Sequence, residues 1–242
     1  MAERPRVAAV LLDVGGTLWP DQVRVDRRVR VDRLLSAWPG LAEQDAAVFL
    51  EQLEELAPIA EQGLTQDVYA LLGQVARAAG LHIGLGRVDV VRKALCVPAA
   101  GYIQLFDGAD ALLRTIRHLN LRCALVSNAS VRSGDEYRAD FAGFGLADLV
   151  DVVVSSIDLG VRKPDPGIFL AALTDLDCPA DRAVIVGNSE RNDIEPGRRL
   201  GTRTIRVAIE EPAPSRTAAD ALVTDLRQVA NLIKAWTNAS SP

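Results

Sequence analysis

The amino-acid sequence predicts an α/β protein with a doubly wound parallel sheet and a group of helices inserted after its first strand. From about residue 108 onward, short apolar segments alternate with amphipathic helical segments, which is typical of strand–helix units with right-handed crossovers. Residues from about 22 to 97 instead carry helical periodicity with almost no strand signal. We therefore expect a core of residues 1–19 and 100–242 and a separate helical domain of residues 20–99.

Length, composition and charge narrow the class of protein. The chain has 242 residues, of which 49% are hydrophobic and 24% charged, enough for one substantial core plus a small second domain. Its net charge of −5 gives no electrostatic case for binding nucleic acid or an anionic membrane. No apolar run approaches the roughly 18 residues of a membrane span, and the first such run is typical of a strand rather than of a signal peptide. We expect a cytoplasmic monomer or homodimer.

Cysteine and histidine usage argues against several kinds of site. The three cysteines are odd in number and show no CxxC spacing, so we expect free thiols rather than disulfides or a zinc site. The two histidines lie in no recognisable catalytic context, which makes a Ser-His-Asp or Cys-His mechanism a poor fit. The chemistry is therefore expected to rest on carboxylates, hydroxyls and basic side chains.

The first strand is predicted at residues 7–12, an apolar run that ends in the single carboxylate of Asp13. Gly15, Gly16 and Thr17 follow at once. The carboxyl end of a buried parallel strand is where open α/β sheets place their ligand crevice. Glycines there let backbone N–H groups approach an anion such as phosphate. The alternative is that Asp13 only ends the strand and caps the turn.

The helical insert is predicted from three apolar stripes, each followed by a residue that ends a helix. The stripes are Phe49, Leu53 and Leu56 before Pro58; Val68, Leu71, Leu72, Val75 and Ala79 before Gly80; and Val88, Val91 and Leu95 before Pro98. A basic run precedes them, formed by Arg24, Arg27, Arg28, Arg30 and Arg33. A helix there either gathers these arginines over an anionic substrate or presents a solvated face offset by Asp26 and Asp32.

The remaining elements follow in alternation. An amphipathic helix carrying Leu112 and Ile116 precedes a strand at residues 121–127. Ser133 and Glu136 have the spacing of a capping box and open the next helix, which precedes a strand at residues 149–155. Asp165 and Pro166 are expected at the N-cap and first position of a further helix. Strands at 183–187 and 203–208, a helix before Gly201, a short strand at 221–223 and a helix to about residue 236 complete the prediction.

Polar side chains follow four of the predicted strands. They are Asp13, the pair Ser127 and Asn128, Lys163 in the loop after residues 149–155, and Asn188 with Asp193 close behind. Because the carboxyl ends of parallel strands meet at the same edge of a sheet, we expect these side chains to converge on one crevice.

This ordered set resembles the haloacid dehalogenase-like (HAD) hydrolase superfamily, in its form with a helical C1-type cap. The four matching segments are Asp13-Val-Gly-Gly-Thr-Leu, Leu125-Val-Ser-Asn-Ala-Ser, Gly160-Val-Arg-Lys-Pro-Asp-Pro-Gly-Ile-Phe and Val186-Gly-Asn-Ser-Glu-Arg-Asn-Asp. The resemblance covers nearly the whole chain. It implies a Rossmann-like core domain, with residues 20–99 as a cap that closes over the cleft.

The resemblance also implies roles for individual residues. Asp13 is implied as the nucleophile, Ser127 as a hydrogen-bond donor to the transferred group, and Lys163 as the cation that neutralises developing charge. Mg²⁺ is implied at four positions, namely Asp13, the carbonyl of Gly15, Asn188 and Asp193. Substrate contacts are expected from Gly16, Thr17, Trp19 and Asn128, although Trp19 could instead pack beneath the cap.

Two departures from the family pattern bear on activity. The phosphatases of the family carry an acid/base Asp two residues after the nucleophile, where this chain has Gly15, and losing such a group typically costs about 10²–10⁴ in rate. Restoring it with Gly15→Asp is expected to raise the rate if the loop accepts a side chain. The first acid of the fourth segment is Asn188, so one negative charge is missing and Mg²⁺ binding is expected to be weaker.

These departures leave three functions open. The favoured one is a HAD-like hydrolase that acts on a small, anionic, phosphorylated metabolite. A 2-haloacid dehalogenase is the first alternative, because a halide leaving group needs no proton and Asn188 and Ser189 are residue types that those enzymes use. A non-catalytic binding protein of the same fold is the second alternative.

Overall fold

The computed structural model describes residues 5–21, 25–60, 67–210 and 212–238. Arg24 of the predicted basic run and residues 239–242 lie outside the described residues. A six-stranded parallel sheet has the order β3-β2-β1-β4-β5-β6. Its strands are β1 (Ala9–Leu12), β2 (Arg122–Ser127), β3 (Val152–Ser155), β4 (Ala183–Gly187), β5 (Arg203–Val207) and β6 (Ala221–Val223). The α/β fold expected from the alternation of segments is therefore confirmed.

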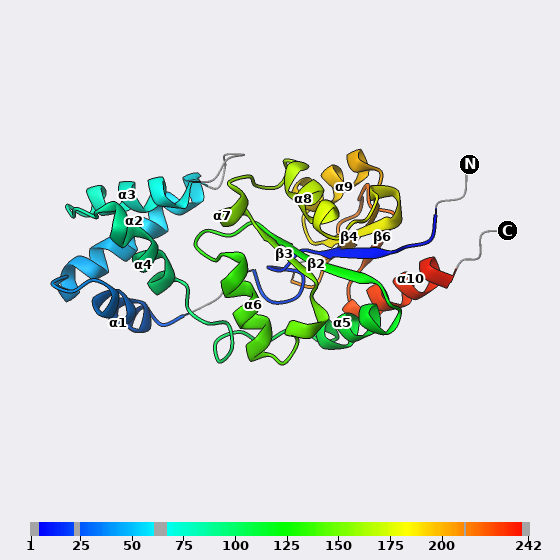
Figure 1. The fold of residues 1–242 in the computed structure, drawn as a ribbon, viewed down its shortest axis with the longest axis horizontal. Coiled ribbons are helices and arrows are strands. Elements are labelled where there is room, and N and C mark those ends of the chain that lie inside the picture. The colour runs from blue at the N-terminus through cyan, green and yellow to red at the C-terminus, as the bar shows by residue number, and fades with distance from the viewer. Residues whose placement is uncertain (1–4, 22–24, 61–66, 211, 239–242) are drawn as a thin grey trace.

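Helices cover both faces of this sheet (Figure 1). One face carries α5 (Ala109–His118), α6 (Gly134–Gly143) and α10 (Leu226–Asn238), and the other carries α8 (Gly167–Asp175) and α9 (Glu195–Leu200). Strand β1 supplies both cores, because successive side chains of a strand point to opposite faces. Val10 and Leu12 pack in the cluster that contains the first group of helices, and Ala9 and Leu11 pack with α8.

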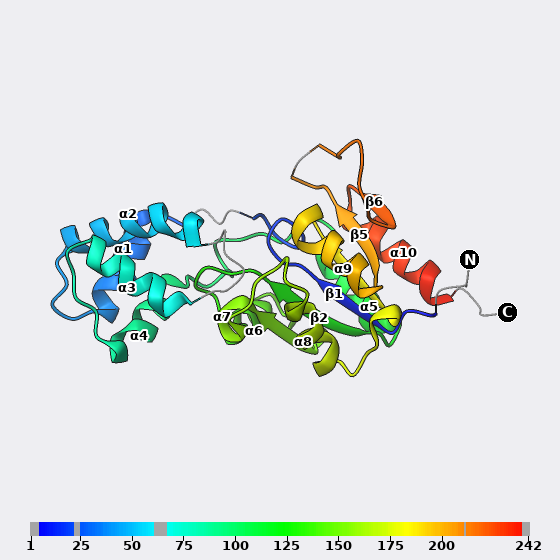
Figure 2. The same cartoon turned by 90° about the horizontal axis from the view of Figure 1, so that it is seen from above.

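The helical insert consists of α1 (Arg27–Ala37), α2 (Glu43–Ala60), α3 (Val68–Ala78) and α4 (Leu85–Leu95). These four helices surround a hydrophobic cluster of their own, with Leu34, Phe49 and Leu72 fully buried. Figures 1 and 2 show the insert projecting from one end of the sheet-containing core. The chain enters it after β1 and leaves it before α5, so the insert is joined to the core by two connections.

One ion pair links the insert to the core. The guanidinium of Arg92, on α4, donates to both carboxylate oxygens of Glu136 on α6 at 2.7 and 3.0 Å, and to the carbonyl of Val131 at 2.7 Å. Glu136 also accepts from the backbone N–H and hydroxyl of Ser133 at 2.7 and 2.6 Å. The predicted capping box is therefore present, and its glutamate also contacts the insert.

Some predicted boundaries were wrong. Pro58 lies inside α2, which ends at Ala60. Proline removes one backbone donor, but in the last turn this costs a single hydrogen bond and the helix continues. The strand expected from residue 149 begins at Val152, because Ala147–Leu149 forms a short 3₁₀ turn in which the N–H of Val150 donates to the carbonyl of Ala147.

The other predicted helix starts and stops have clear physical causes. Asp165 accepts a hydrogen bond from the N–H of Gly167 at 2.8 Å, and α8 begins at Gly167, one residue later than expected. Gly201 ends α9 with a left-handed φ of 82°. A five-residue π-helical segment, Glu190–Ile194, precedes α9.

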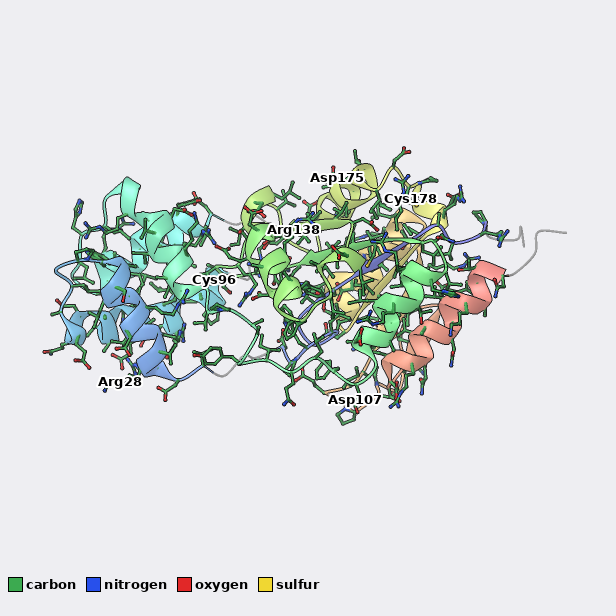
Figure 3. All side chains as sticks on the ribbon, turned by 60° about the horizontal axis from the view of Figure 1, so that its bottom comes forward. Arg28, Cys96, Asp107, Arg138, Asp175 and Cys178 are labelled. Atoms are coloured by element: carbon green, nitrogen blue, oxygen red, sulfur yellow. The ribbon has the colours of Figure 1, made fainter. Side chains whose placement is uncertain are left out.

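All three cysteines are free and buried. Cys96 follows α4 and Cys178 follows α8, and the two lie far apart in Figure 3. In the described part of the chain, no helix combines the length and the apolar character that crossing a membrane requires.

Candidate active site

The site lies where the strand order reverses. Strand β1 pairs with β2 on one side and β4 on the other, so connections leave it in both directions across the sheet. A crevice forms at such a switch point, outside the carboxyl ends of the strands. Asp13 follows β1 directly, and its backbone N–H donates to the carbonyl of Val186 on β4 at 2.9 Å. The position of this carboxylate is therefore set by the central strands.

A tight turn after Asp13 holds its carboxylate. The N–H of Leu18 donates to the carbonyl of Val14 at 2.8 Å, and the N–H of Gly16 donates to the carbonyl of Trp19 at 2.7 Å. The hydroxyl of Thr17 then reaches back to Oδ2 of Asp13 at 2.7 Å. Gly16 and Thr17 are predicted substrate contacts; in the structure the N–H of Gly16 bonds to Trp19, and the hydroxyl of Thr17 bonds to Asp13.

Gly16 meets two requirements at once. Its φ of 70° is left-handed, a conformation that costs glycine little. A Cβ at this position would lie 2.1 Å from the amide nitrogen of Asn188, so any side chain would also collide with the loop after β4.

Lys163 lies between two carboxylates. Its Nζ is 2.6 Å from Oδ1 of Asp13 and 2.8 Å from Oδ1 of Asp193. The side chains of Lys163 and Asp193 are each only 1% exposed. Oδ2 of Asp193 accepts a hydrogen bond from the N–H of Ser189 at 3.1 Å. Residues 150 positions apart in the chain thus form one buried, hydrogen-bonded group.

The charges in this group depend on one another. Burial by itself lowers the pKa of Lys163, but the carboxylates of Asp13 and Asp193 outweigh it and raise that pKa to about 12. Burial raises the pKa of Asp193 to about 6 against the opposing charge of Lys163. With all three groups ionised, two anions and one cation leave a formal charge of −1, so the lysine is held as an ammonium ion beside Asp13.

Asn128 connects the loop after β2 to Lys163. Its side-chain oxygen accepts from the backbone N–H of Lys163 at 2.8 Å, and its side-chain nitrogen donates to the carbonyl of Lys163 at 3.0 Å. Both ends of the amide are therefore used to fix the backbone that carries the lysine. Asn128 was predicted as a substrate contact; the structure gives it a positioning contact at the wall of the same cavity.

Ser127 forms a hydroxyl pair that the sequence did not indicate. Its Oγ lies 2.7 Å from the hydroxyl of Tyr137, on α6, and both side chains are buried. Burial raises the pKa of Tyr137 to about 12, so the phenol keeps its proton. The sequence analysis assigned no role to Tyr137, because its helical spacing from Phe141 is equally that of a core position.

Trp19 packs against the core rather than beneath the insert. Its ring stacks on Tyr137 with a centroid distance of 5.9 Å and an interplanar angle of 15°, and it also contacts Phe141 and Phe144. It is 4% exposed and lies at the wall of the cavity. Of the two places that the sequence left open for Trp19, the structure shows the wall of the cavity, and its ring packs on the core instead of beneath the insert.

A cavity of about 640 Å³ opens above these groups, and cationic side chains line it. Its cations are Arg132, Arg162, Lys163 and Arg191, from the loops after β2, β3 and β4. Asp21, Gly15, Ser127 and Asn128 also line it, whereas no residue of α1 to α4 does. The sequence predicted no role for these three arginines, although Arg162 and Arg191 lie inside matched segments and Arg132 lies two residues after one.

The arginines of α1 point elsewhere. Arg27 donates to the carbonyl of Ala47 and Arg30 pairs with Glu54, both on α2. Arg33 donates to carbonyls at the end of α4, and Arg28 is exposed on the outer side of the insert (Figure 3). Of the two alternatives that the sequence left open for these described arginines, the structure fits the solvated face better than a group over an anionic substrate, because neighbouring helices and solvent take up their charges.

Fold and site together define a class: a Rossmann-like α/β protein with a carboxylate–lysine–carboxylate group at its switch point. Residues 7–201 match the family described as haloacid dehalogenase-like hydrolase. The chain belongs to this family of hydrolase enzymes, as its four segments implied.

Relatives and solved structures agree with this assignment. The chain is 32% identical over 126 residues to a phosphoserine phosphatase of Thermus thermophilus, covering 52% of this chain and about half, 49%, of that protein. It is 26% identical over 243 residues to an N-acetylmuramic acid 6-phosphate phosphatase of Pseudomonas aeruginosa, covering 96% of both chains.

Two solved structures share the fold at low identity. A HAD phosphatase from Thermococcus onnurineus superposes with a TM-score of 0.62 at 19% identity, covering 94% of this chain and 98% of that one. An L-2-haloacid dehalogenase from Xanthobacter autotrophicus gives 0.57 at 22%, with the same coverage.

Proposed function

We propose that this protein is a phosphatase-type hydrolase in which Asp13 attacks the phosphorus of a small phosphorylated metabolite. The observation that carries the proposal is the ammonium group of Lys163, held 2.6 Å from Asp13 at the base of a cavity lined by cations. The ammonium places a positive charge beside the carboxylate of Asp13, and a carboxylate in its ionised form is the nucleophile of this reaction class. The phosphatase names of the relatives support the same reaction class.

The other residues of the site have separate roles in the proposed reaction. Lys163 offsets negative charge on the phosphoryl oxygens, and Thr17 holds Asp13 in one orientation. Ser127 is a hydroxyl donor to the transferred group, kept in place by Tyr137. Arg132, Arg162 and Arg191 surround the cavity with positive charge, which favours an anionic substrate. Its volume lies within the range of about 300–1,000 Å³ that is typical of small-molecule sites.

The residues present fit Mg²⁺ by their donor chemistry. The carboxylates of Asp13 and Asp193, the amide oxygen of Asn188 and the carbonyl of Gly15 are all hard oxygen ligands. No three His, Cys, Asp or Glu side chains cluster as a metal site among the described residues, so neutral oxygens must complete the set. Bound Mg²⁺ supplies charge that polarises the phosphoryl oxygens. Asp13 and Asp193 would hold the ion with their carboxylates, and Asn188 would add its amide oxygen from the loop after β4.

The insert is proposed as the cap of this site, with residues 20–99 as its domain. Its helices form a separate hydrophobic cluster and are joined to the core by two connections next to the cavity. A unit of this kind can move as a body over the crevice while the core residues stay in place.

A dehalogenase is the second candidate function. Gly15 carries no carboxylate, and a halide leaving group needs no proton from the enzyme. The lysine–carboxylate group also suits attack by Asp13 on the carbon of a 2-haloacid. Asp193 paired with Lys163 favours the metal-dependent phosphatase, because it keeps a second oxygen ligand next to Asp13.

An activity screen tests the proposal. Phosphate monoesters, acyl phosphates and 2-haloacids are assayed with and without Mg²⁺, for the natural sequence, for Asp13→Asn and for a control variant, Asp107→Asn, at an exposed carboxylate outside the cavity. We expect Mg²⁺-dependent turnover of phosphates that Asp13→Asn abolishes and Asp107→Asn retains.

The other outcomes decide between the alternatives. Turnover that survives in Asp13→Asn would remove Asp13 from its role. Metal-independent release of halide would establish the dehalogenase. Binding of phosphate compounds without any turnover would identify the non-catalytic protein.

A further inference from the structure

The turn after β1 brings the side chain of Asp21 back to Gly15. A Cβ built on Gly15 would lie 2.9 Å from Oδ1 of Asp21 and 3.6 Å from its Cα. The return path is set by the turn itself, in which Gly16 bonds to Trp19 and the backbones of Gly15 and Trp19 form a bridge. One carboxylate oxygen of Asp21 thus lies within 2.9 Å of the point where the side chain of residue 15 would begin.

The same side chain lines the proposed active site. Asp21 is a wall residue of the cavity that also contains Gly15, Ser127 and Lys163. Its backbone N–H donates to the carboxylate of Glu210, in the loop after β5, at 3.0 Å. The backbone is therefore held from the core, and the residue is exposed at the cavity wall.

We propose that Asp21 is the general acid and base of this enzyme. Although it lies six residues further along the chain, its carboxylate replaces the one that position 15 lacks. The proposal rests on the phosphatase function proposed above and adds the group that handles its protons. Two observations carry it: the oxygen of Asp21 next to the empty side-chain position of Gly15, and its place in the cavity wall.

The reaction balances in two steps. In the first, a carboxylate oxygen of Asp13 forms a bond to phosphorus, the bond from phosphorus to the ester oxygen breaks, and that oxygen takes the proton of Asp21 to leave as an alcohol. In the second, water attacks phosphorus and gives its proton to Asp21, while the bond from phosphorus to Asp13 breaks. Inorganic phosphate is released, and Asp13 is a carboxylate and Asp21 a carboxylic acid again.

Glycine at position 15 is the residue that permits this arrangement. Any side chain there would start within 2.9 Å of the Asp21 oxygen and push it out of place. The expectation that Gly15→Asp simply raises the rate therefore needs revision: in the natural background it would set two carboxylates against each other. The informative variant is the double substitution Gly15→Asp and Asp21→Asn, called the exchange variant, which moves the carboxylate from position 21 to position 15.

The test measures how the rate depends on the leaving group. The natural protein, Asp21→Asn and the control Asp107→Asn are compared on p-nitrophenyl phosphate, phenyl phosphate and an alkyl phosphate in Mg²⁺. Asp21→Asn is expected to lose about 10²–10⁴ in the rate of the alkyl ester, whose leaving oxygen needs a proton. Formation of p-nitrophenolate is expected to lose far less in its first turnover, because this ion leaves without protonation.

A second readout follows the covalent intermediate. Without a base to activate water, the phosphorylated Asp13 of Asp21→Asn should accumulate after a burst with p-nitrophenyl phosphate. Mass spectrometry of the quenched protein detects it as one added phosphoryl group on the peptide that contains Asp13. Gly15→Ala, which displaces Asp21 without removing it, is expected to show the same two signatures in weaker form.

The outcomes separate this inference from the function on which it depends. If Asp21→Asn and Gly15→Ala keep the natural leaving-group dependence and no intermediate accumulates, the inference is overturned while the phosphatase function stands. If the natural protein neither turns over any phosphate ester nor becomes phosphorylated, both fall. Recovery of alkyl ester hydrolysis in the exchange variant supports the role of Asp21 as a displaced acid.

Discussion

At the scale of single residues, two glycines let polar side chains come close to the strand ends. Gly16 lies against the amide of Asn188, and Gly187, the last residue of β4, lies against the carboxylate of Asp193. A Cβ at Gly187 would be 2.3 Å from Cγ of Asp193. The contact between Lys163 and Asp193 therefore depends on the absence of a side chain at Gly187, the last residue of β4.

Gly187→Ala tests this dependence. The added methyl group is expected to displace the buried carboxylate of Asp193 and to lower the free energy of unfolding by about 1–3 kcal/mol, the usual cost of overpacking. Urea denaturation measures the change. Gly73→Ala is the control, because that glycine lies in α3 with only the end of an arginine nearby, and alanine there is expected to stabilise the helix by about 0.5–1 kcal/mol. Equal effects of both variants would contradict the argument.

The acidic and basic centre of the site was predictable, and its surroundings were not. Asp13, Lys163 and Asp193 follow or flank buried strands, and parallel topology forces such positions together. Tyr137 could not be found, because on α6 its spacing is equally that of a core residue. Asp21 could not be found either, because its place depends on the exact path of a turn and not on a strand end.

At the scale of elements, charged side chains of α6, of α4 and of the segment before α6 form the junction between the insert and the core. Arg92 reaches from α4 to Glu136, and Arg132 pairs with Asp140 while donating to the carbonyl of Val97 at 2.8 Å. Asp140 also accepts from the N–H of Ala99 at 2.6 Å. Both the last helix of the insert and the segment that leaves it are thus bonded to one helix of the core.

Glu136 gives this junction a pH dependence. Burial raises its pKa, but the hydrogen bonds from Arg92 and Ser133 outweigh burial and hold the pKa below the usual 4.5. A lowered folded-state pKa means that the ionised group stabilises the fold above the unfolded pKa, and that this contribution is lost as pH falls through the folded value. We expect Glu136→Gln to reduce stability near neutral pH and to flatten the loss of stability below pH 4.5.

The measurement is the free energy of unfolding as a function of pH. Asp135→Asn is the control, because Asp135 lies next to Glu136 in the first turn of α6 but is exposed. A pH profile of Glu136→Gln that runs parallel to the natural one below pH 4.5 would show that this carboxylate does not titrate with folding.

At the scale of the whole molecule, the sheet and the insert play different parts. Most residues at the floor and walls of the cavity lie in the segments that follow strands of the core, whereas Asp21 precedes the insert and Ile103 follows it. Sequence periodicity predicted this division, because the strand pattern is absent between residues 22 and 97. It could not predict where the insert lies relative to the cavity, since no local signal encodes that placement.

Metal binding tests the assembled site. Because Asn188 stands where an acid is expected, Asn188→Asp should strengthen Mg²⁺ binding by about tenfold, or about 1.4 kcal/mol. Isothermal titration of the folded protein with MgCl₂ measures the dissociation constant without any substrate. Asn120→Asp, a substitution of the same kind outside the cavity, is the control and should leave the dissociation constant unchanged. An unchanged constant in Asn188→Asp would exclude Asn188 from the ligand set.

The two connections of the insert have a consequence for making hybrids with related enzymes. Because α1 to α4 contribute nothing to the lining of the cavity as it stands, exchanging them between Asp21 and Val97 for the equivalent region of another family member leaves the reacting groups untouched. The partners of Arg132 and Glu136, and the apolar contacts of Val131 and Ile157, need to be matched at the seam. Such chimeras would show separately which residues cleave the bond and which residues select the substrate.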